Sequence, residues 1–355
     1  MTTTTILGEG ATAGTEVMVV ADVLNKVFRF GEDVWIMSHP VTPAAIIVLY
    51  LFLVYWVTPG LVKRYEPIER IGKVKFHTFG MMYNAMLSFL SLLLLVVMLK
   101  TLIEMERATS LFDVVCDPNA VFVGTPIYIL YFVNYLLKYV ELIDTLLIQM
   151  RGKSPMKLQV YHHFITLALT YIQGITESSI QWLPIVLNLA VHVCMYAHFA
   201  WMEHETLARL RDPTKHVLSS DKKHPWWRTA LTMFQIFQFV VAMILGIIVL
   251  GMRLMLRLEI APPNMPVCHG TDGGAVFGFG VLGSFLVAFV NFFITDRRNE
   301  QKKRLERKVQ QQSGFCSLAQ QALHAADSTA TQVVHPPGLF AGFQPLLPTN
   351  QDKTD

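Results

Sequence analysis

Seven long apolar segments dominate this chain and restrict the folds that it can adopt. A helix needs roughly 20 apolar residues to cross the hydrocarbon core of a bilayer. Segments of about that length lie at residues 41–58, 78–99, 120–137, 157–174, 182–202, 229–251 and 275–295. A further apolar stretch at 139–150 follows the third segment and blurs its end. The pattern predicts an all-α polytopic membrane protein, a bundle of seven transmembrane helices.

The composition supports this class of protein. Hydrophobic residues make up 53% of the 355 residues and charged residues only 15%, whereas soluble domains carry about 25% charged residues. Residues 1–40 lack the basic start, short apolar run and small-residue cleavage site of a signal peptide. We therefore expect an N-terminal arm at 1–40, a membrane domain at 41–305 and a disordered tail at 306–355, where Gln, Ala, Thr and Pro are frequent.

Basic residues alternate between the predicted loops and indicate the orientation. They are frequent in the first and fifth loops and in the tail, the third loop holds Arg151 and Lys153, and the second, fourth and sixth loops have few. Because cytosolic loops carry an excess of Lys and Arg, we expect a cytosolic C-terminus and an N-terminus on the opposite side. Cys116 and Cys268 both fall in loops on that opposite side, where disulfides can form. We predict that they pair, with two free cysteines as the alternative.

Polar residues recur at helical spacing inside four of the apolar segments. Polar side chains are costly to bury in hydrocarbon, so such residues indicate function, and positions three or four apart share one face of a helix. The stripes are Asn134, Lys138, Glu141, Asp144, Thr145 and Gln149; Gln159, His162 and His163; Asn188, His192, Met195 and Tyr196, with His198 nearby; and Thr232, Gln235 and Gln238. Together they predict one polar cavity inside the bundle.

The first two stripes also have a structural alternative. The first could be an amphipathic helix at the membrane surface, and a single histidine in a span more often packs than catalyses. Depth favours a shared cavity, because at roughly 1.5 Å per residue His162 lies about 8 Å and His192 about 14 Å inside the cytosolic boundary. A head group would then arrive from the cytosol, and its apolar tail would extend toward the other side.

The four stripes, taken in order, resemble the signature motifs of the ELO family, the fatty-acid elongases of the endoplasmic reticulum. The matching residues are Lys138-x-x-Glu141-x-x-Asp144-Thr145, His162-His163, Asn188-x-x-Val191-His192-x-x-Met195-Tyr196 and Thr232-x-x-Gln235-x-x-Gln238-Phe239. The resemblance covers about residues 40–305. It implies a seven-helix enzyme that encloses an acyl tunnel and condenses a long-chain acyl-CoA with malonyl-CoA. The product is a 3-oxoacyl-CoA two carbons longer, and CO2 and CoA are released.

The resemblance also implies a location and partners. We expect a multi-pass protein of the endoplasmic reticulum membrane with a lumenal N-terminal arm, a lumenal cysteine pair and a cytosolic tail. The other enzymes of the elongation cycle, which are reductases and a dehydratase, are the expected protein partners, and a homo-oligomer is an option. Acyl-CoA and malonyl-CoA are substrates, so we expect no cofactor, no metal and no nucleic acid.

Two residues depart from the family pattern. Gln159 occupies the first position of the usual His-x-x-His-His box, and Leu137 stands where a small polar residue is common. Glutamine cannot titrate near neutral pH, so we expect Gln159 to orient its neighbours. This form of the box resembles that of microbial and algal elongases acting on polyunsaturated chains, which suggests a polyunsaturated substrate.

The predicted roles follow from the chemistry of each side chain. His162 attacks the thioester to give an acyl-imidazole, or alternatively serves as a general base, and His163 orients it. His192, with Asn188 and Tyr196, stabilises the oxyanion or enolate. The supporting residues are Lys138, Glu141, Asp144, Thr145, Gln235 and Gln238. Arg151, Lys153 and Arg228 are candidates for contacts with CoA phosphates, unless they only reflect the positive-inside charge.

Two other classes of protein share some of these features. Gln159-x-x-His162-His163 also resembles a histidine box of the di-iron membrane desaturases and hydroxylases, but such sites need several boxes, and only four histidines lie in the spans. A seven-helix receptor or a transporter fits the predicted orientation. The chain lacks Asp-Arg-Tyr at the end of the third span and Asn-Pro-x-x-Tyr in the seventh, and a transporter would not need a reactive His162.

Overall fold

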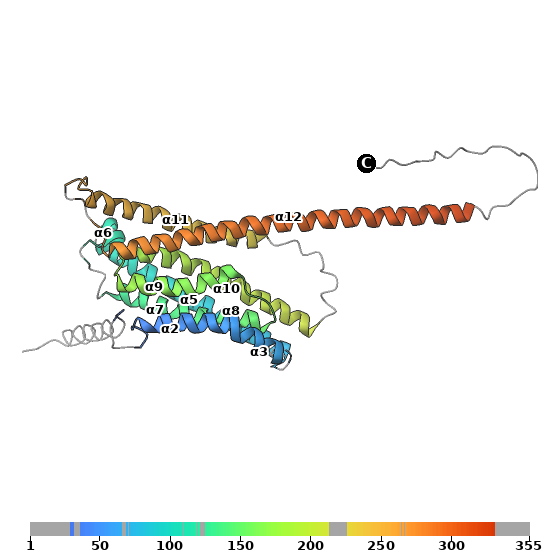
Figure 1. The fold of residues 1–355 in the computed structure, drawn as a ribbon, viewed down its shortest axis with the longest axis horizontal. Helices are drawn as coiled ribbons and strands as arrows, with labels where there is room; N and C mark the ends of the chain where they lie inside the picture. Colours follow the sequence, from blue (N-terminus) through green and yellow to red (C-terminus); the bar gives the residue numbers. More distant parts are fainter. Residues whose placement is uncertain are drawn as a thin grey trace, which may run out of the picture. The chain divides into compact units, whose positions relative to one another are not determined.

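The computed structural model describes residues 29–31, 36–65, 69, 71–108, 110–118, 120, 125–212, 226–263, 265 and 267–330. All regular elements within these residues are helices (Figure 1). They are α2 (Val41–Phe52), the π-helical η1 (Leu53–Val57), α3 (Thr58–Tyr65), α5 (Lys73–Ala108), α6 (Leu111–Cys116), α7 (Pro126–Glu141), α8 (Ile143–Met150), α9 (Lys157–Ile175), the 3-10 helix η2 (Ser179–Gln181), α10 (Trp182–Arg211), α11 (Trp226–Arg257) and α12 (Asp272–Ala330).

Six helical segments of the described residues are long and apolar enough to cross a membrane. They are Val41–Arg64, Lys73–Arg107, Pro126–Met150, Ser179–Arg211, Trp227–Arg257 and Asp272–Gln310. The predicted fourth span corresponds to α9, a helix of 19 residues that is not among the six. Its two histidines and two glutamines make it less apolar than the others. The structure is thus that of a multi-pass membrane protein with six candidate spans, against the seven predicted.

The third span begins later and ends later than the sequence predicted. The helix starts at Pro126. Proline is favoured in the first turn of a helix, because the backbone N–H groups there have no partner within the helix and proline has no N–H. It then continues through α8 to Met150 with only Leu142 between the two helices. The apolar stretch at 139–150 therefore belongs to this span.

The helices pack into a bundle with α9 close to its centre. α10 packs along α5, and α7 packs against both α9 and α5. α2 also contacts α9, and α11 contacts α10. The aromatic side chains of Phe239 on α11 and Phe285 on α12 pack together beside Tyr161 of α9. The helix that carries the two adjacent histidines is thereby held by elements from both halves of the chain.

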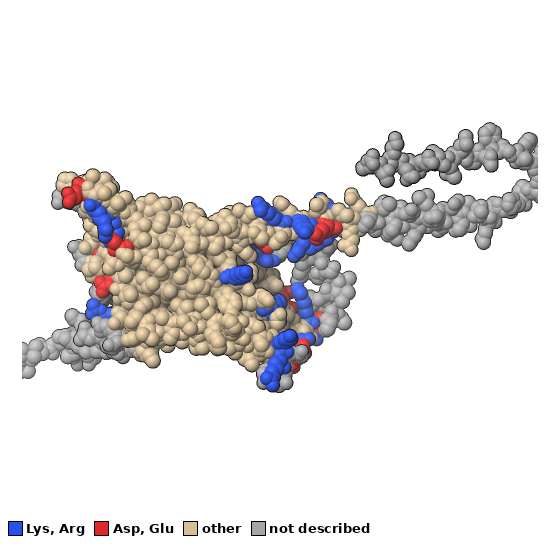
Figure 2. All heavy atoms as spheres, in the orientation of Figure 1, with Lys and Arg blue, Asp and Glu red and all other residues tan. Residues whose placement is uncertain are grey.

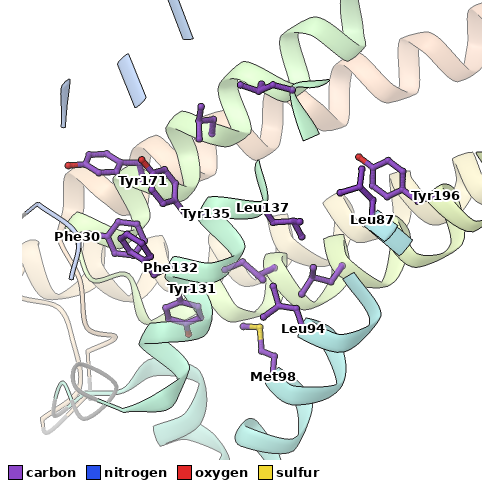
Figure 3. Packing of buried hydrophobic residues seen from close by; sticks show 14 of the residues in the cluster. Phe30, Leu87, Leu94, Met98, Tyr131, Phe132, Tyr135, Leu137, Tyr171 and Tyr196 are labelled. Carbon is purple, nitrogen blue, oxygen red and sulfur yellow. The ribbon is translucent and has the colours of Figure 1, made fainter. Parts of the chain in front are cut away.

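Phe30, which precedes the first span, is part of the hydrophobic core. Its ring centroid lies 4.9 Å from that of Phe132 and 5.5 Å from that of Tyr135 (Figure 3). Gly174 of α9 makes room for it, because a Cβ there would lie 2.5 Å from the ring. The predicted boundary at residue 40 separated Phe30 from the membrane domain, whereas the structure packs it inside. The rest of the arm, 1–28 and 32–35, lies outside the described residues.

A disulfide joins Cys116 at the end of α6 to Cys268 in the segment between α11 and α12. This confirms the predicted pair. Arg253 of α11 holds the same segment, since its guanidinium donates to the carbonyl oxygens of Cys268 (2.7 Å) and Gly270 (2.8 Å) and to Asp272 (2.6 Å). This end of the bundle is therefore tied together covalently and by hydrogen bonds.

The surface of the bundle is suited to a lipid environment. On the face shown in Figure 2, charged side chains gather at the two ends and leave an uncharged belt between them. Large apolar side chains such as Phe89, Val97 and Ile247 are exposed along the helices. In water such a surface would be unfavourable, whereas in a bilayer it faces acyl chains.

The last helix is longer than the sequence predicted. α12 continues to Ala330, whereas the composition predicted a disordered tail from residue 306. Residues 306–330 contain no proline and include five Ala and five Gln, which favour helix, and they extend a helix that is already formed. Residues 331–355 lie outside the described part of the chain.

Candidate active site

His162 and His163 lie on α9 and face different surroundings. The ring of His162 packs against Phe285 and Phe289 of α12, with centroids 4.8 and 5.9 Å away, and it lines a cavity. His163 is buried and does not line that cavity. Gln159 is half-buried and makes no hydrogen bond to His162 or His163. No direct hydrogen bond from Gln159 to either histidine therefore supports the predicted orienting role.

A buried ion cluster lies next to His162. Lys138 of α7 donates to both carboxylate oxygens of Glu141, at 2.9 and 3.2 Å, and to Oδ1 of Asn188 on α10, at 2.8 Å. His192 Nδ1 lies 3.1 Å from Glu141 Oε1, and His192 Nε2 lies 3.3 Å from the Asn188 amide nitrogen. Lys138 and Glu141 are each under 4% exposed. A charge pair this deep is stable because each charge is compensated and hydrogen-bonded.

Glu141 is the centre of this cluster. Its carboxylate is the shared electrostatic neighbour of Lys138, His192 and His163. A carboxylate that accepts from one imidazole nitrogen fixes which nitrogen carries the proton and how the ring is oriented. Glu141 thus orients His192 directly, and the sequence had left open whether Glu141 or Asp144 would hold a histidine.

The rest of the first stripe points to other helices. Asp144 accepts a hydrogen bond of 2.6 Å from the hydroxyl of Tyr196. Thr145 pairs with Tyr50 of α2 at 2.8 Å, and the Gln149 amide donates to the Val54 carbonyl at 2.7 Å. These contacts bind α8 to α2, η1 and α10. The stripe therefore does not face one cavity along its whole length, because Asp144, Thr145 and Gln149 contact other helices.

The fourth stripe divides in the same way. Gln238 and Phe239 line the cavity beside His162. The Gln235 amide lies 3.8 Å from the sulfur of Met195, and the Thr232 hydroxyl donates to the carbonyl of Arg228. Asn134, at the start of the first stripe, also lines the cavity. Asn134 belongs to the first polar stripe, but its spacing alone did not predict a place in the site.

Two adjoining cavities extend from His162. The first comprises about 500 Å³ of space, part of it open to the surroundings, and is bordered by His162, Lys138, Asn188 and Gln238. The second comprises about 650 Å³, also partly open, and reaches Ile180, Leu245 and Val249, which pack against the Cys116–Cys268 disulfide. Six residues line both cavities, namely Leu169, Thr170, Pro184, Ile185, Ala242 and Leu282. Apart from the polar group at His162, the lining is mainly apolar.

The predicted CoA contacts are not equivalent in the structure. Arg151 forms an ion pair with Glu203 of α10, and Glu203 also lies 2.6 Å from His77 Nδ1 on α5. Because Arg151 is paired in this half-buried triad, it is a poor candidate for binding phosphate. Lys153 and Arg228 are exposed. The sequence could not indicate the triad, since Glu203 lies 52 positions from Arg151 and 126 from His77, and these separations follow no spacing rule.

The described residues contain no group of three or more His, Cys, Asp or Glu side chains placed to hold a metal ion. This arrangement gives the di-iron alternative no support within that part of the chain. What the described residues do form is a multi-pass helical membrane protein with a histidine at the junction of a buried ion cluster and an apolar cavity.

The chain matches the model of the ELO (GNS1/SUR4) family over residues 35–305 and belongs to that family. Putative fatty acid elongase 1 of Schizosaccharomyces pombe is 31% identical over 238 residues, which cover 67% of this chain and 66% of that protein. Fatty acid elongase A of Dictyostelium discoideum is 28% identical over 269 residues, 75% of this chain and 87% of that protein. Fatty acid elongase 2 of Trypanosoma brucei brucei is 26% identical over 275 residues, 77% of this chain and 94% of that protein.

Proposed function

We propose that the protein is a fatty-acid elongase that catalyses the condensing step of elongation. It joins a long-chain acyl-CoA to malonyl-CoA, giving a 3-oxoacyl-CoA two carbons longer with release of CO2 and CoA. Family membership and the names of the relatives support this. The observation that carries the proposal is the position of His162, between a polar cluster that can handle charge and an apolar cavity that can take an acyl chain.

His162 acts as the nucleophile. An imidazole nitrogen attacks the thioester carbon, the electron pair of the C=O bond moves to oxygen, and its return breaks the C–S bond. The products are an acyl-imidazole and CoA thiolate, which takes up a proton. Splitting the condensation in this way replaces one difficult step with two easier ones.

Malonyl-CoA completes the reaction. Its carboxylate leaves as CO2, the freed electron pair forms the new C–C bond at the acyl carbon, and His162 is released. Overall, one proton is consumed for each turnover. His192, whose Nδ1 lies 3.1 Å from Glu141 Oε1, is the member of the ion cluster that holds and returns this proton. Lys138 keeps the Glu141 carboxylate compensated throughout.

The two adjoining cavities form the tunnel for the acyl chain. His162 and Gln173 line its two ends on α9, and eleven residues of helix rise about 17 Å. With α9 as a further span, the bundle has seven transmembrane helices. The Gln159 form of the histidine box supports a polyunsaturated substrate.

The setting of the enzyme follows from the same assignment. It lies in the endoplasmic reticulum membrane with its N-terminus in the lumen and its C-terminus in the cytosol. It requires no cofactor, binds no nucleic acid, and passes its product to the reductases and dehydratase of the cycle. Lys153 and Arg228 are the remaining candidates for CoA contacts.

The test uses purified protein in detergent, supplied with a panel of saturated and polyunsaturated acyl-CoAs and labelled malonyl-CoA. We expect labelled 3-oxoacyl-CoA from the wild type and none from His162→Ala. His198→Ala is the matched control, because His198 is also a histidine within a span but packs against Trp227. No product from any acyl-CoA with folded wild type would refute the function, and product from His162→Ala would refute the acyl-imidazole.

A further inference from the structure

Two side-chain amides in the cavity beside His162 have no partner. Asn134 of α7 is 1% exposed and Gln238 of α11 is 5% exposed, and both line the cavity with His162. The oxygen atoms Asn134 Oδ1 and Gln238 Oε1 are buried without a hydrogen bond, as is His162 Nδ1. Within the described residues the two amide nitrogens, which are the donors, make no hydrogen bond either. An amide buried in this way is unfavourable, so each unpaired group calls for an explanation.

The other polar groups around the cavity are already engaged. Lys138 donates to Glu141 and Asn188, and the Asn188 amide nitrogen lies beside His192. The hydroxyls of Thr166 and Thr170 donate to carbonyl oxygens of their own helix. Among the described residues that line the cavity, the uncommitted amides are therefore those of Asn134 and Gln238.

The expected oxyanion donors are committed as well. The sequence favoured His192, with Asn188 and Tyr196, for this role. In the structure His192 Nδ1 lies 3.1 Å from Glu141 Oε1, Tyr196 donates to Asp144 at 2.6 Å, and Asn188 belongs to the ion cluster. A group already hydrogen-bonded within the protein must break that bond before it can stabilise a new charge. Preorganised donors without a competing partner serve this purpose better.

The acyl chain that we place in the cavity has one polar atom near His162, the oxygen of its thioester carbonyl. An acyl chain is apolar except at its thioester carbonyl, whose oxygen accepts hydrogen bonds and becomes negative when a nucleophile attacks the carbon. Amide nitrogens carry two donor hydrogens each. The remaining lining, which includes Leu169, Ile185 and Phe285, offers no competing donor.

We propose that Asn134 and Gln238 are catalytic residues that donate hydrogen bonds to the acyl carbonyl oxygen attacked by His162. As the N–C bond forms, the electron pair of the C=O bond moves to that oxygen, and the two amides hold the oxyanion. The pair returns when the C–S bond breaks. This inference rests on the proposed elongase function, and it applies to the oxyanion of the condensation itself even if His162 acts as a base.

The test replaces each amide with an apolar side chain of similar shape, Asn134→Leu and Gln238→Met, in the full-length protein. With acyl-CoA alone, the rate of CoA thiol release reports the first chemical step, and kcat with malonyl-CoA reports the whole reaction. Loss of one oxyanion donor lowers the rate roughly 10²- to 10³-fold. We expect that loss in the first step or in kcat, with acyl-CoA affinity unchanged.

Gln149→Met is the matched control, because its buried amide is hydrogen-bonded to Val54 outside the cavity. It should lower thermal stability and preserve the rate, whereas Asn134→Leu and Gln238→Met should preserve stability and lower the rate. Wild-type kcat in both cavity variants would overturn the inference, and so would a loss of rate that only follows a loss of stability. Failure of the wild type to make any 3-oxoacyl-CoA would instead refute the proposed function.

Discussion

Lys138→Met should destabilise the protein far more than the double replacement Lys138→Met with Glu141→Leu. The two side chains are 3% and 1% exposed and lie 2.9 Å apart at Nζ and Oε1. Removing one member leaves the other charge buried without compensation. Removing both leaves a cluster without net charge, which is much less unfavourable in a low-dielectric interior.

The magnitude follows from the surroundings of Glu141. Breaking a buried ion pair by removing one partner costs about 3–5 kcal/mol. His192 Nδ1 lies 3.1 Å from Glu141 Oε1, so a proton taken up by His192 replaces part of the lost positive charge. The loss of unfolding free energy should therefore be near the lower bound, about 3 kcal/mol. The double variant should recover at least half of it.

The measurement is reversible unfolding in mixed micelles, followed by tryptophan fluorescence, with both variants and the wild type at one detergent composition. Glu141→Leu alone completes the cycle and gives the coupling energy of the pair. Equal stability of Lys138→Met and the wild type would refute the buried pair. A double variant as unstable as the sum of the single variants would refute the coupling between the two residues. Neither Lys138→Met nor the double variant should elongate, because both lose the Lys138 ammonium group and the double variant also loses the carboxylate beside His192.

Three further predictions address the tunnel, the disulfide and the arginine triad. Ala242 lines both cavities, so Ala242→Phe should narrow their junction. Elongation of the longest acyl-CoAs should then be abolished while shorter ones are still elongated, as gas chromatography of the products would show. An unchanged chain-length preference would contradict a continuous tunnel. The double variant Cys116→Ser with Cys268→Ser should lose about 2–5 kcal/mol of unfolding free energy, measured in the same micelles. It should also release longer products, because Ile180 and Val249 of the second cavity lose the disulfide against which they pack. Stability identical to that of the wild type would count against the disulfide. Arg151→Met should lower the melting temperature without raising the KM for acyl-CoA, because Arg151 is paired with Glu203. A rise in KM with unchanged stability would instead support a role of Arg151 in binding CoA.

Much of the fold could be predicted because hydropathy and charge act locally. Span positions follow from runs of apolar residues, and the pairing of Cys116 with Cys268 followed from the side of the membrane on which their loops fall. The boundaries were less predictable. The helix of the third span begins only at Pro126. Phe30 packs in the core because Gly174 leaves space for its ring, a contact that no local sequence pattern predicts.

The candidate site was predictable in its residue types and less so in its contacts. Helical spacing placed Lys138 and Glu141 on one face, and the structure pairs them. The same spacing also placed Asp144 and Gln149 on that face, yet they bond to Tyr196 and Val54 on other helices. Helix faces are a property of sequence, whereas the partner of each face depends on how the helices assemble.

The most direct test of the account is to look for acyl-His162. The purified protein is incubated with an acyl-CoA alone, digested, and analysed by mass spectrometry for the peptide that contains His162. We predict a mass increase equal to the acyl group on His162, which disappears when malonyl-CoA is added and is absent from His162→Ala. An active enzyme whose His162 remains unmodified while product forms would contradict the central claim.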